Sequence, residues 1–344
     1  ASMLAEQLAN AMASQAMLWQ TAPAANEMEA LVIDWLREAV GLPGTFTGTI
    51  HDSATTATFS AVVTMREKAL DYAGIGNGLS GAPRLRLYAS AQTHSSVDKA
   101  ARLCGIGQDN LVKIPGRAGD RLFSMDPAAL DAAIRADFDA GLKPAGVVLA
   151  TGGTAIGACD DLAASIAVAK AHGLPTHVDA AWAGSAMIAP EFRTLWAGVE
   201  EADSVVFNPH KWLGAQFDAS VQFLKDPGVQ VAAMGLRPDY LQTQGPGEVV
   251  NYNEWTLPLG RRFRALKLWF LLRIEGLEAL RAMIRNHVAW SREAADAIAA
   301  LDGFEITTQP ILSLFTFRYR DDAATAALLD AVNRAGRIYL TQTT

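Results

Sequence analysis

The stretch Asp203-Ser-Val-Val-Phe-Asn-Pro-His-Lys-Trp-Leu-Gly214 predicts a short buried strand followed by a turn that carries a lysine. Residues 204–207 are mostly apolar, and Asn208-Pro209 ends the strand. A lysine at the end of a buried strand must be neutralised or paired, because burying an isolated charge is costly. Imine formation with an aldehyde cofactor is one way to remove the charge of Lys211. A surface lysine in a loop explains this segment equally well, so the rest of the chain must decide.

The segments around this stretch alternate between strands and helices. The apolar patterns predict strands at residues 85–89, 110–115, 146–150, 176–179 and 219–224, and helices at 53–72, 95–103, 126–140 and 161–172. We interpret residues 44–52 as a loop that contains Gly48. Repeated alternation with short connections is typical of an α/β fold with a mostly parallel sheet covered on both faces.

The two ends of the chain extend this pattern. Helices are predicted at residues 3–19 and 27–40, the second with Asn26 as its N-cap. The last third predicts helices at 261–274, 277–300 and 323–335 and strands at 304–307, 312–318 and 338–344. We therefore expect a large domain over residues 1–268 and a small α+β domain over residues 269–344.

The composition excludes several classes of protein. Of 344 residues, 50% are hydrophobic and 19% charged, which indicates a sizeable core rather than disorder. The net charge of −7 without a basic block argues against nucleic acid as a partner, and no apolar run is long enough to span a membrane. Two cysteines, Cys104 and Cys159, give no disulfide framework, which favours a cytoplasmic location.

Polar residues fall at the predicted helix starts and after a strand. Ser53-Ala54-Thr55 opens a helix, where hydroxyls, free backbone N–H groups and the helix dipole suit a phosphate; an ordinary N-cap is the alternative. His94 follows a strand, where its ring could stack on a flat ligand or be merely structural.

Two further groups follow buried strands. Asp179 ends the strand at residues 176–179 and needs a cationic partner, either a protonated pyridine nitrogen or a nearby arginine. Thr151-Gly-Gly-Thr154 offers hydroxyls and close backbone approach, or is a plain turn. The histidines lack the spacing of zinc ligands, so no metal site is predicted.

These weak signals form one set when they are combined. In an open α/β sheet the strand ends share a crevice in which ligands bind. A pyridoxal 5′-phosphate site needs an anion cup, a face for the ring, a carboxylate for the ring nitrogen and an imine lysine. Ser53-Ala54-Thr55, His94, Asp179 and Lys211 supply these parts in turn.

The whole chain resembles the group II pyridoxal-phosphate decarboxylases, in particular the aromatic-L-amino-acid decarboxylases that act on dopa, tryptophan or tyrosine. The resemblance is carried by Ala91-Gln-Thr-His-Ser-Ser-Val97, His177-Val-Asp-Ala-Ala-Trp-Ala-Gly-Ser185, Pro190-Glu-Phe-Arg193, Phe207-Asn-Pro-His-Lys-Trp-Leu213 and Pro258-Leu-Gly-Arg-Arg-Phe-Arg264. It implies the fold type I of pyridoxal-phosphate enzymes, similar to aspartate aminotransferase, with a seven-stranded sheet in the large domain.

The resemblance also implies a role for each matching residue. Lys211 would form the imine with pyridoxal 5′-phosphate, Asp179 would pair with the pyridine nitrogen, and His94 would stack on the ring. Further cofactor contacts would come from Ala54, Thr55, Thr154, Ala181, Asn208 and His210. Tyr240 matches the tyrosine of a mobile catalytic loop and would protonate Cα after CO₂ is lost. Related aldehyde synthases carry phenylalanine there, so Tyr240 favours simple decarboxylation.

Substrate choice is expected to depend on Gly260 and Trp182. Gly260 matches a position where glycine leaves room for a bulky aromatic ring, whereas Trp182 replaces the tyrosine of the animal enzymes. A glutamate or 2,4-diaminobutyrate decarboxylase is the second enzymatic interpretation, although such a substrate requires a pocket arginine that the sequence does not place. A cofactor-binding scaffold without turnover is a third.

The resemblance finally implies a homodimer with its active site at the subunit interface. The family's N-terminal segment, which swaps between subunits and lines the side-chain pocket, would precede Ala1. The family's last strands and helix would follow Thr344, so we expect a truncated form of the enzyme.

Overall fold

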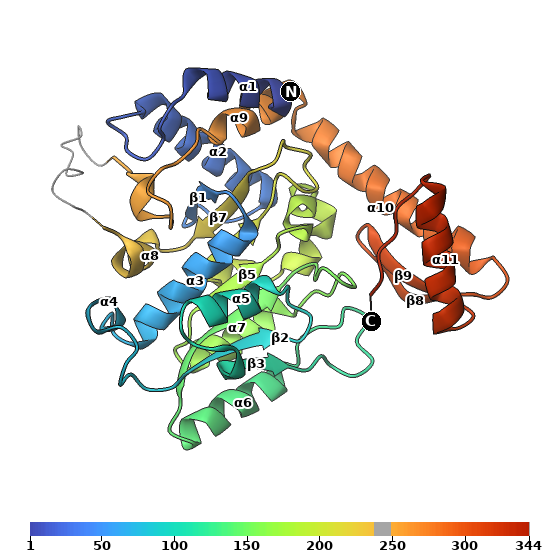
Figure 1. The fold of residues 1–344 in the computed structure, drawn as a ribbon, viewed down its shortest axis with the longest axis horizontal. Helices are drawn as coiled ribbons and strands as arrows, with labels where there is room; N and C mark the ends of the chain where they lie inside the picture. Colours follow the sequence, from blue (N-terminus) through green and yellow to red (C-terminus); the bar gives the residue numbers. More distant parts are fainter. Residues whose placement is uncertain (237–248, 344) are drawn as a thin grey trace.

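The central element of the computed structural model, which describes residues 1–236 and 249–343, is a seven-stranded sheet in the order β1-β7-β6-β5-β4-β2-β3 (Figure 1). The strands are β1 (Thr47–His51), β2 (Leu85–Ser90), β3 (Leu111–Ile114), β4 (Lys143–Ala150), β5 (Thr176–Asp179), β6 (Ser204–Phe207) and β7 (Ser220–Leu224). Strand β7 runs antiparallel to both of its neighbours, and the other pairs are parallel. The predicted mostly parallel seven-stranded sheet is confirmed.

Helices cover both faces of this sheet. One face packs against α3 (Ala54–Ala69), α5 (Ser96–Leu103) and α8 (Pro227–Met234). The other packs against α2 (Pro23–Val40), α6 (Pro127–Asp139) and α7 (Leu162–Ala171), and α2 in turn contacts α9 (Ala265–Ile274). Successive residues of a strand point to opposite faces, so Leu87 and Ala89 join the α3 side of the core whereas Tyr88 joins the α2 side.

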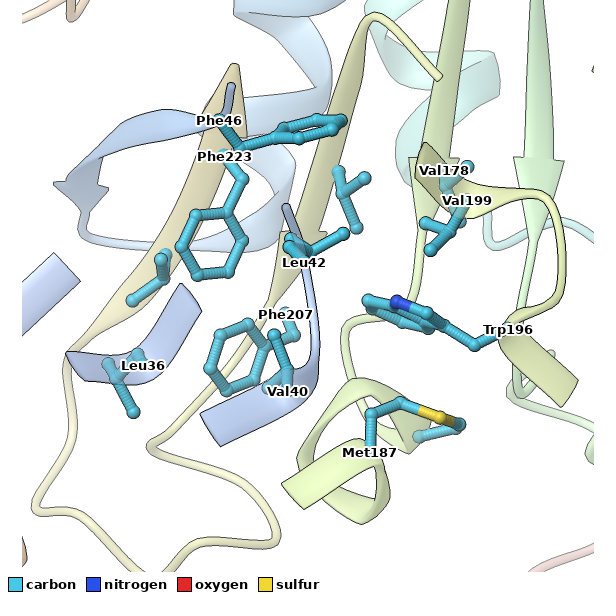
Figure 2. Close-up of a cluster of buried hydrophobic side chains, with 14 of the residues drawn as sticks. Leu36, Val40, Leu42, Phe46, Val178, Met187, Trp196, Val199, Phe207 and Phe223 are labelled. Atoms are coloured by element: carbon cyan, nitrogen blue, oxygen red, sulfur yellow. The ribbon is translucent and has the colours of Figure 1, made fainter. Parts of the chain in front are cut away.

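Figure 2 shows part of the core on the α2 side, where helix, loop and strand residues meet. Phe207 of β6 and Phe223 of β7 stack with ring centroids 5.9 Å apart, and Leu36 of α2 packs in the same cluster. All three side chains are buried. Removing this much apolar surface from water anchors β6, and therefore the turn that follows it.

The first strand of the sheet overturns the loop predicted for residues 44–52. β1 pairs antiparallel with β7, and Gly48 allows the approach, because a Cβ there would lie 2.3 Å from the carbonyl oxygen of Gln222. The glycine that suggested a loop therefore serves close strand packing.

Three local predictions at the chain ends are also wrong. Asn26 is not an N-cap: α2 begins at Pro23, and the buried Asn26 amide donates to the carbonyl oxygens of Leu18 and Ala22. The first helix, α1 (Ser2–Met12), ends seven residues before the predicted position 19, because Ala13 adopts a left-handed conformation. Within residues 338–343 no strand forms.

A second, two-stranded sheet lies to one side of the main sheet (Figure 1). Strands β8 (Phe304–Ile311) and β9 (Leu314–Tyr319) pair antiparallel, with α10 (Leu277–Ala299) and α11 (Asp322–Ala335) packed against them. The other helices of the described residues are short: α4 (Gly74–Asn77), η1 (Gln108–Asn110), η2 (Ala183–Ile188), η3 (Pro190–Trp196), η4 (Val199–Glu201) and η6 (Tyr252–Glu254). In the described part of the chain, no helix combines the length and apolarity needed to cross a membrane.

Candidate active site

A cavity of about 180 Å³ opens at the carboxyl ends of β4, β5 and β6. These three strands are adjacent and parallel, so Ala150, Asp179 and Phe207 end at the same edge of the sheet. The cavity is lined by Ser53, Ala54, Thr55, His94, Ala150, Gly152, Gly153, Thr154, Asp179, Ala181, Trp182, Asn208, His210 and Lys211. The structure thus brings together every residue predicted to contact the cofactor.

Lys211 lies four residues beyond the end of β6. Its backbone N–H donates to the carbonyl oxygen of Asn208, which closes the turn, and the N–H of Asn208 donates to the carbonyl oxygen of Ala181. The premise that Lys211 would be buried is wrong, because its side chain is exposed where it lines the cavity. Lys211 forms no ion pair within residues 1–236 and 249–343, so its amine is available to a ligand.

Asp179 is the buried charge of the cavity. Only 7% of the residue is exposed, and the N–H of Ala181 donates to its Oδ1 over 3.0 Å. No arginine or lysine pairs with this carboxylate in the described ranges, which removes the arginine interpretation there. Burial raises the pKa of Asp179, while the hydrogen bond from Ala181 and the proximity of His94 and Lys211 act in the opposite direction. A cationic ligand atom would supply the missing partner.

The N-terminus of α3 faces the cavity. Ser53 caps the helix, since its Oγ accepts the backbone N–H of Thr56 over 3.2 Å. The first-turn N–H groups of Ala54 and Thr55 have no acceptor within the helix, as in every helix N-terminus. The N-cap interpretation of Ser53 is confirmed. It does not compete with phosphate binding, because the first-turn N–H groups stay available to an anion.

Side chains from two loops complete the rim. The Nδ1 atom of His94 accepts the backbone N–H of Ser96 over 3.1 Å, so its ring proton lies on Nε2. The Nδ1 atom of His210 accepts the N–H of Ala219 over 2.9 Å in the same way. Asn208 is buried, and its Oδ1 has no hydrogen-bond partner in the described structure. The backbone therefore orients the two imidazole rings, and Asn208 contributes an unsatisfied acceptor to the lining.

Comparisons with known proteins point to one family. Residues 1–320 match the family model described as the pyridoxal-dependent decarboxylase conserved domain. The chain is 39% identical over 354 residues to the aromatic-L-amino-acid decarboxylase of Sus scrofa, covering 98% of this chain and 72% of that protein. It is 36% identical over 359 residues to the phenylacetaldehyde synthase of Arabidopsis thaliana, covering all of this chain and 72% of that protein.

A solved structure gives the same result. The crystal structure of Oryza sativa TDC with PLP and tryptamine superposes with a TM-score of 0.95 at 35% identity, covering all of this chain and 74% of that one. The chain belongs to the pyridoxal-dependent decarboxylase family. The predicted family, fold type and cofactor are confirmed, and so is the carboxy-lyase class of the enzyme.

The cavity of this decarboxylase fits pyridoxal 5′-phosphate group by group. The unpaired carboxylate of Asp179 suits a protonated pyridine nitrogen, the α3 N-terminus suits the phosphate, and the exposed amine of Lys211 suits the aldehyde. Small side chains at Ala150 and Ala181 leave space for a flat ring.

The two residues predicted to select the substrate lie apart. Trp182 lines the cofactor cavity, whereas Gly260 lines a second cavity of about 320 Å³. That second cavity lies between α1 and residues 260–264 and does not include Lys211. Tyr240 lies outside the described residues.

The sequence did not reveal Trp212 and His287 as neighbours of the site. Trp212 follows Lys211 directly, but its stacking on Trp182 depends on the folded chain. His287 lies on α10, inside the predicted small domain, and carries no local signal that would connect it with the cavity.

Proposed function

We propose that this enzyme removes the carboxyl group of an aromatic L-amino acid and releases the amine and CO₂. The observation that carries the substrate class is the lining of the cofactor cavity. Trp182 offers an aromatic face there, and among the described residues no arginine lines the cavity to bind a second carboxylate. Relatives named tryptophan decarboxylase and aromatic-L-amino-acid decarboxylase support the same class over glutamate or 2,4-diaminobutyrate.

Each lining residue has a proposed task. Lys211 holds the cofactor through its amine, and Asp179 keeps the cofactor's ring nitrogen protonated. His94 covers one face of the ring and Ala181 the other, while Thr154 lies near its oxygen. The N–H groups of Ala54 and Thr55 bind the phosphate, with Asn208 and His210 beside it. The bound cofactor supplies an electron sink for the bond pair that CO₂ leaves on Cα.

Tyr240 is proposed to return a proton to Cα. A phenolic hydroxyl can donate the proton, whereas a phenylalanine at this position cannot. The choice between amine and aldehyde as product therefore rests on this side chain. The identity of residue 240 matters here because the relatives include both decarboxylases and the phenylacetaldehyde synthase.

A second copy of the chain is proposed to complete the pocket in a cytoplasmic homodimer. Leu4, Leu8 and Met12 form an exposed apolar row on α1 with a spacing of four residues, which places them on one face of the helix. The other side of α1 lines the cavity that contains Gly260. We also propose that the chain divides into a large domain over residues 1–268 and a small domain over residues 269–344.

The proposal is tested by measuring CO₂ and amine release with tryptophan, dopa, tyrosine, histidine, glutamate and diaminobutyrate. We expect turnover of one or more of the first three only. Turnover confined to glutamate or diaminobutyrate would overturn the aromatic class. No turnover, together with a cofactor absorbance band, would identify the scaffold without activity.

The role of Tyr240 has its own test. Replacing Tyr240→Phe should divert product from amine to aldehyde, with ammonia release and oxygen uptake, because Cα is no longer protonated. Tyr339→Phe, at an exposed tyrosine near the end of the chain, is the control and should give amine as before. An unchanged amine yield in Tyr240→Phe would contradict the assignment.

A further inference from the structure

An aromatic column runs from the cofactor cavity to α10. The indole of Trp182, which lines the cavity, stacks on that of Trp212 with centroids 5.1 Å apart and an interplanar angle of 9°. The ring of His287 on α10 lies beside Trp212, with centroids 6.5 Å apart and planes at 7°, and the hydrogen bond between the two rings joins them edge to edge. Offset stacking of the two indoles is favourable beyond the apolar area that it buries. The cavity wall is therefore the first of three adjoining rings, Trp182, Trp212 and His287, which we call the aromatic column.

The inner end of the column packs against backbone. A Cβ at Gly152 would lie 2.8 Å from Cε3 of Trp182 and 2.4 Å from Cβ of Ala183, and its φ of +83° favours glycine. The Trp182 indole thus contacts the Gly152 backbone while it stacks on Trp212. Its position depends on where Trp212 is held.

Trp212 is held by a hydrogen bond to α10. The indole N–H of this buried residue donates to Nδ1 of His287 over 2.9 Å in a partly buried hydrogen bond. Nδ1 must therefore be unprotonated, with the imidazole proton on Nε2. Without an acceptor at residue 287, the indole N–H would lose the hydrogen bond that fixes it, which favours a different position of the ring.

The helix that carries His287 is itself fixed to the wall of the site. Nε of Arg281 donates to the carbonyl oxygen of Ile188, the last residue of η2, over 2.7 Å. Arg285 pairs with Glu191 at 2.5 Å, one segment further on. Both contacts tie α10 to the chain that directly follows Trp182, so His287 is a defined support and not a chance neighbour.

We propose that His287 is a positioning residue, which holds Trp212 and through it the Trp182 face against which the substrate's aromatic ring packs. This inference rests on the proposed function for the nature of the substrate, but the column itself does not. The amine of Lys211 and the carboxylate of Asp179 are not part of it. Loss of the hydrogen bond should therefore weaken substrate binding and leave the cofactor in place.

The experiment compares His287→Leu with His287→Gln in the cofactor-loaded enzyme. Leucine removes the acceptor, whereas the glutamine amide oxygen restores it. We expect His287→Leu to change the near-ultraviolet circular dichroism of the tryptophans and to raise KM about 3- to 10-fold, with kcat within about twofold, the size expected for one lost aromatic contact. His287→Gln should return both values toward those of the wild type.

A matched control is His172→Leu. His172 is a partly buried histidine at the end of α7 that bonds Asp131 over 2.7 Å, away from the cavity lining. It should change neither the tryptophan spectrum nor KM. If His287→Leu fails to fold, Trp212→Phe tests the same bond, because it keeps an aromatic ring and removes the N–H. Adding His287→Gln to Trp212→Phe should then have no further effect on KM.

Three outcomes would overturn the inference: a wild-type spectrum and KM in folded His287→Leu, equal losses in the leucine and glutamine variants, or a changed spectrum with an unchanged KM. Failure of the proposed function is distinguishable from these. If the wild type uses no aromatic amino acid, KM is measured with the amino acid that it does use. The spectral comparison then still tests the column.

Discussion

The cofactor cavity and the cavity around Gly260 differ in how their charged side chains are balanced. In the cofactor cavity, neither Asp179 nor Lys211 forms an ion pair with the described residues. Around Gly260, Arg261 bonds Glu29, and Arg262 bonds Glu6. Both cavities contain charged side chains, but only in the first do they lack ion-pair partners among the residues that the structure describes.

This difference separates a binding site from a structural one. The Arg261–Glu29 pair spans 2.6 Å with both side chains almost fully buried, and Glu29 also accepts from Thr49 and from the N–H of Ile50. Such a network is satisfied without a ligand. An unpaired buried carboxylate is instead maintained against its desolvation cost and is completed by what binds there.

The largest effect is expected at Lys211. Lys211→Ala should lower decarboxylation by roughly 10⁴-fold or more, because the group that anchors the cofactor is lost. It should also abolish the visible absorbance of the covalently held cofactor. Lys225→Ala, at a lysine that contacts Glu200 and Glu201 on the surface, should retain both. Persistence of the band in Lys211→Ala would refute the anchoring role.

At the Gly260 cavity, substitution of a paired charge should instead lower the stability of the fold. Arg261→Met leaves Glu29 buried and unpaired, which should lower the free energy of unfolding by about 3–5 kcal/mol. Urea unfolding measures this, and Arg318→Met, at an exposed pair with Glu305, should cost about 1 kcal/mol or less. Equal losses of unfolding free energy in the two variants would show that the ion pair at the Gly260 cavity is not a structural one.

Asp179→Asn should weaken cofactor binding about 10- to 100-fold, the range for a hydrogen bond to a charged group. In the cofactor-free protein, the same substitution should stabilise the fold. Burial raises the folded-state pKa of Asp179, so its ionised form destabilises the fold increasingly as pH rises above the ordinary pKa of an aspartate.

Asn removes that penalty. The Tm of cofactor-free Asp179→Asn should therefore exceed that of the wild type at pH 7, and the difference should shrink as pH falls toward the ordinary range. Asp139→Asn, at an exposed residue, should show no such trend. A lower Tm of Asp179→Asn at pH 7 would show that the carboxylate is paired in the free protein.

The smallest effect is expected at the helix cap. Ser53→Ala should lower stability by about 1 kcal/mol and weaken the cofactor a few-fold, since the cap holds the N-terminus of α3 at the cavity. Asp126→Ala removes the corresponding cap of α6, outside the cavity lining. It should cost similar stability and leave cofactor affinity unchanged. Equal cofactor affinities in the two variants would show that the N-terminus of α3 does not bind the phosphate.

Local patterns in the sequence predicted the elements that carry the cofactor site. Asp179 ends its strand as predicted, and Ser53 caps its helix as predicted. Lys211 follows β6 in the turn that Asn208-Pro209 indicated. These features depend on strand ends and caps, which are decided by a few neighbouring residues. The parallel sheet then places them at one edge.

Long-range packing decided the rest. Gly48 lies in a strand because its lack of a side chain lets β1 pack closely against β7. Asn26 lies inside a helix, where its side-chain amide donates to the carbonyl oxygen of Leu18. The separation of Gly260 from Lys211 and the approach of His287 to Trp212 join residues far apart in the chain. The sequence by itself determined which chemical groups the enzyme possesses and where elements begin and end. Only the tertiary structure decided which of those groups are left unpaired, because pairing depends on contacts that no local pattern encodes.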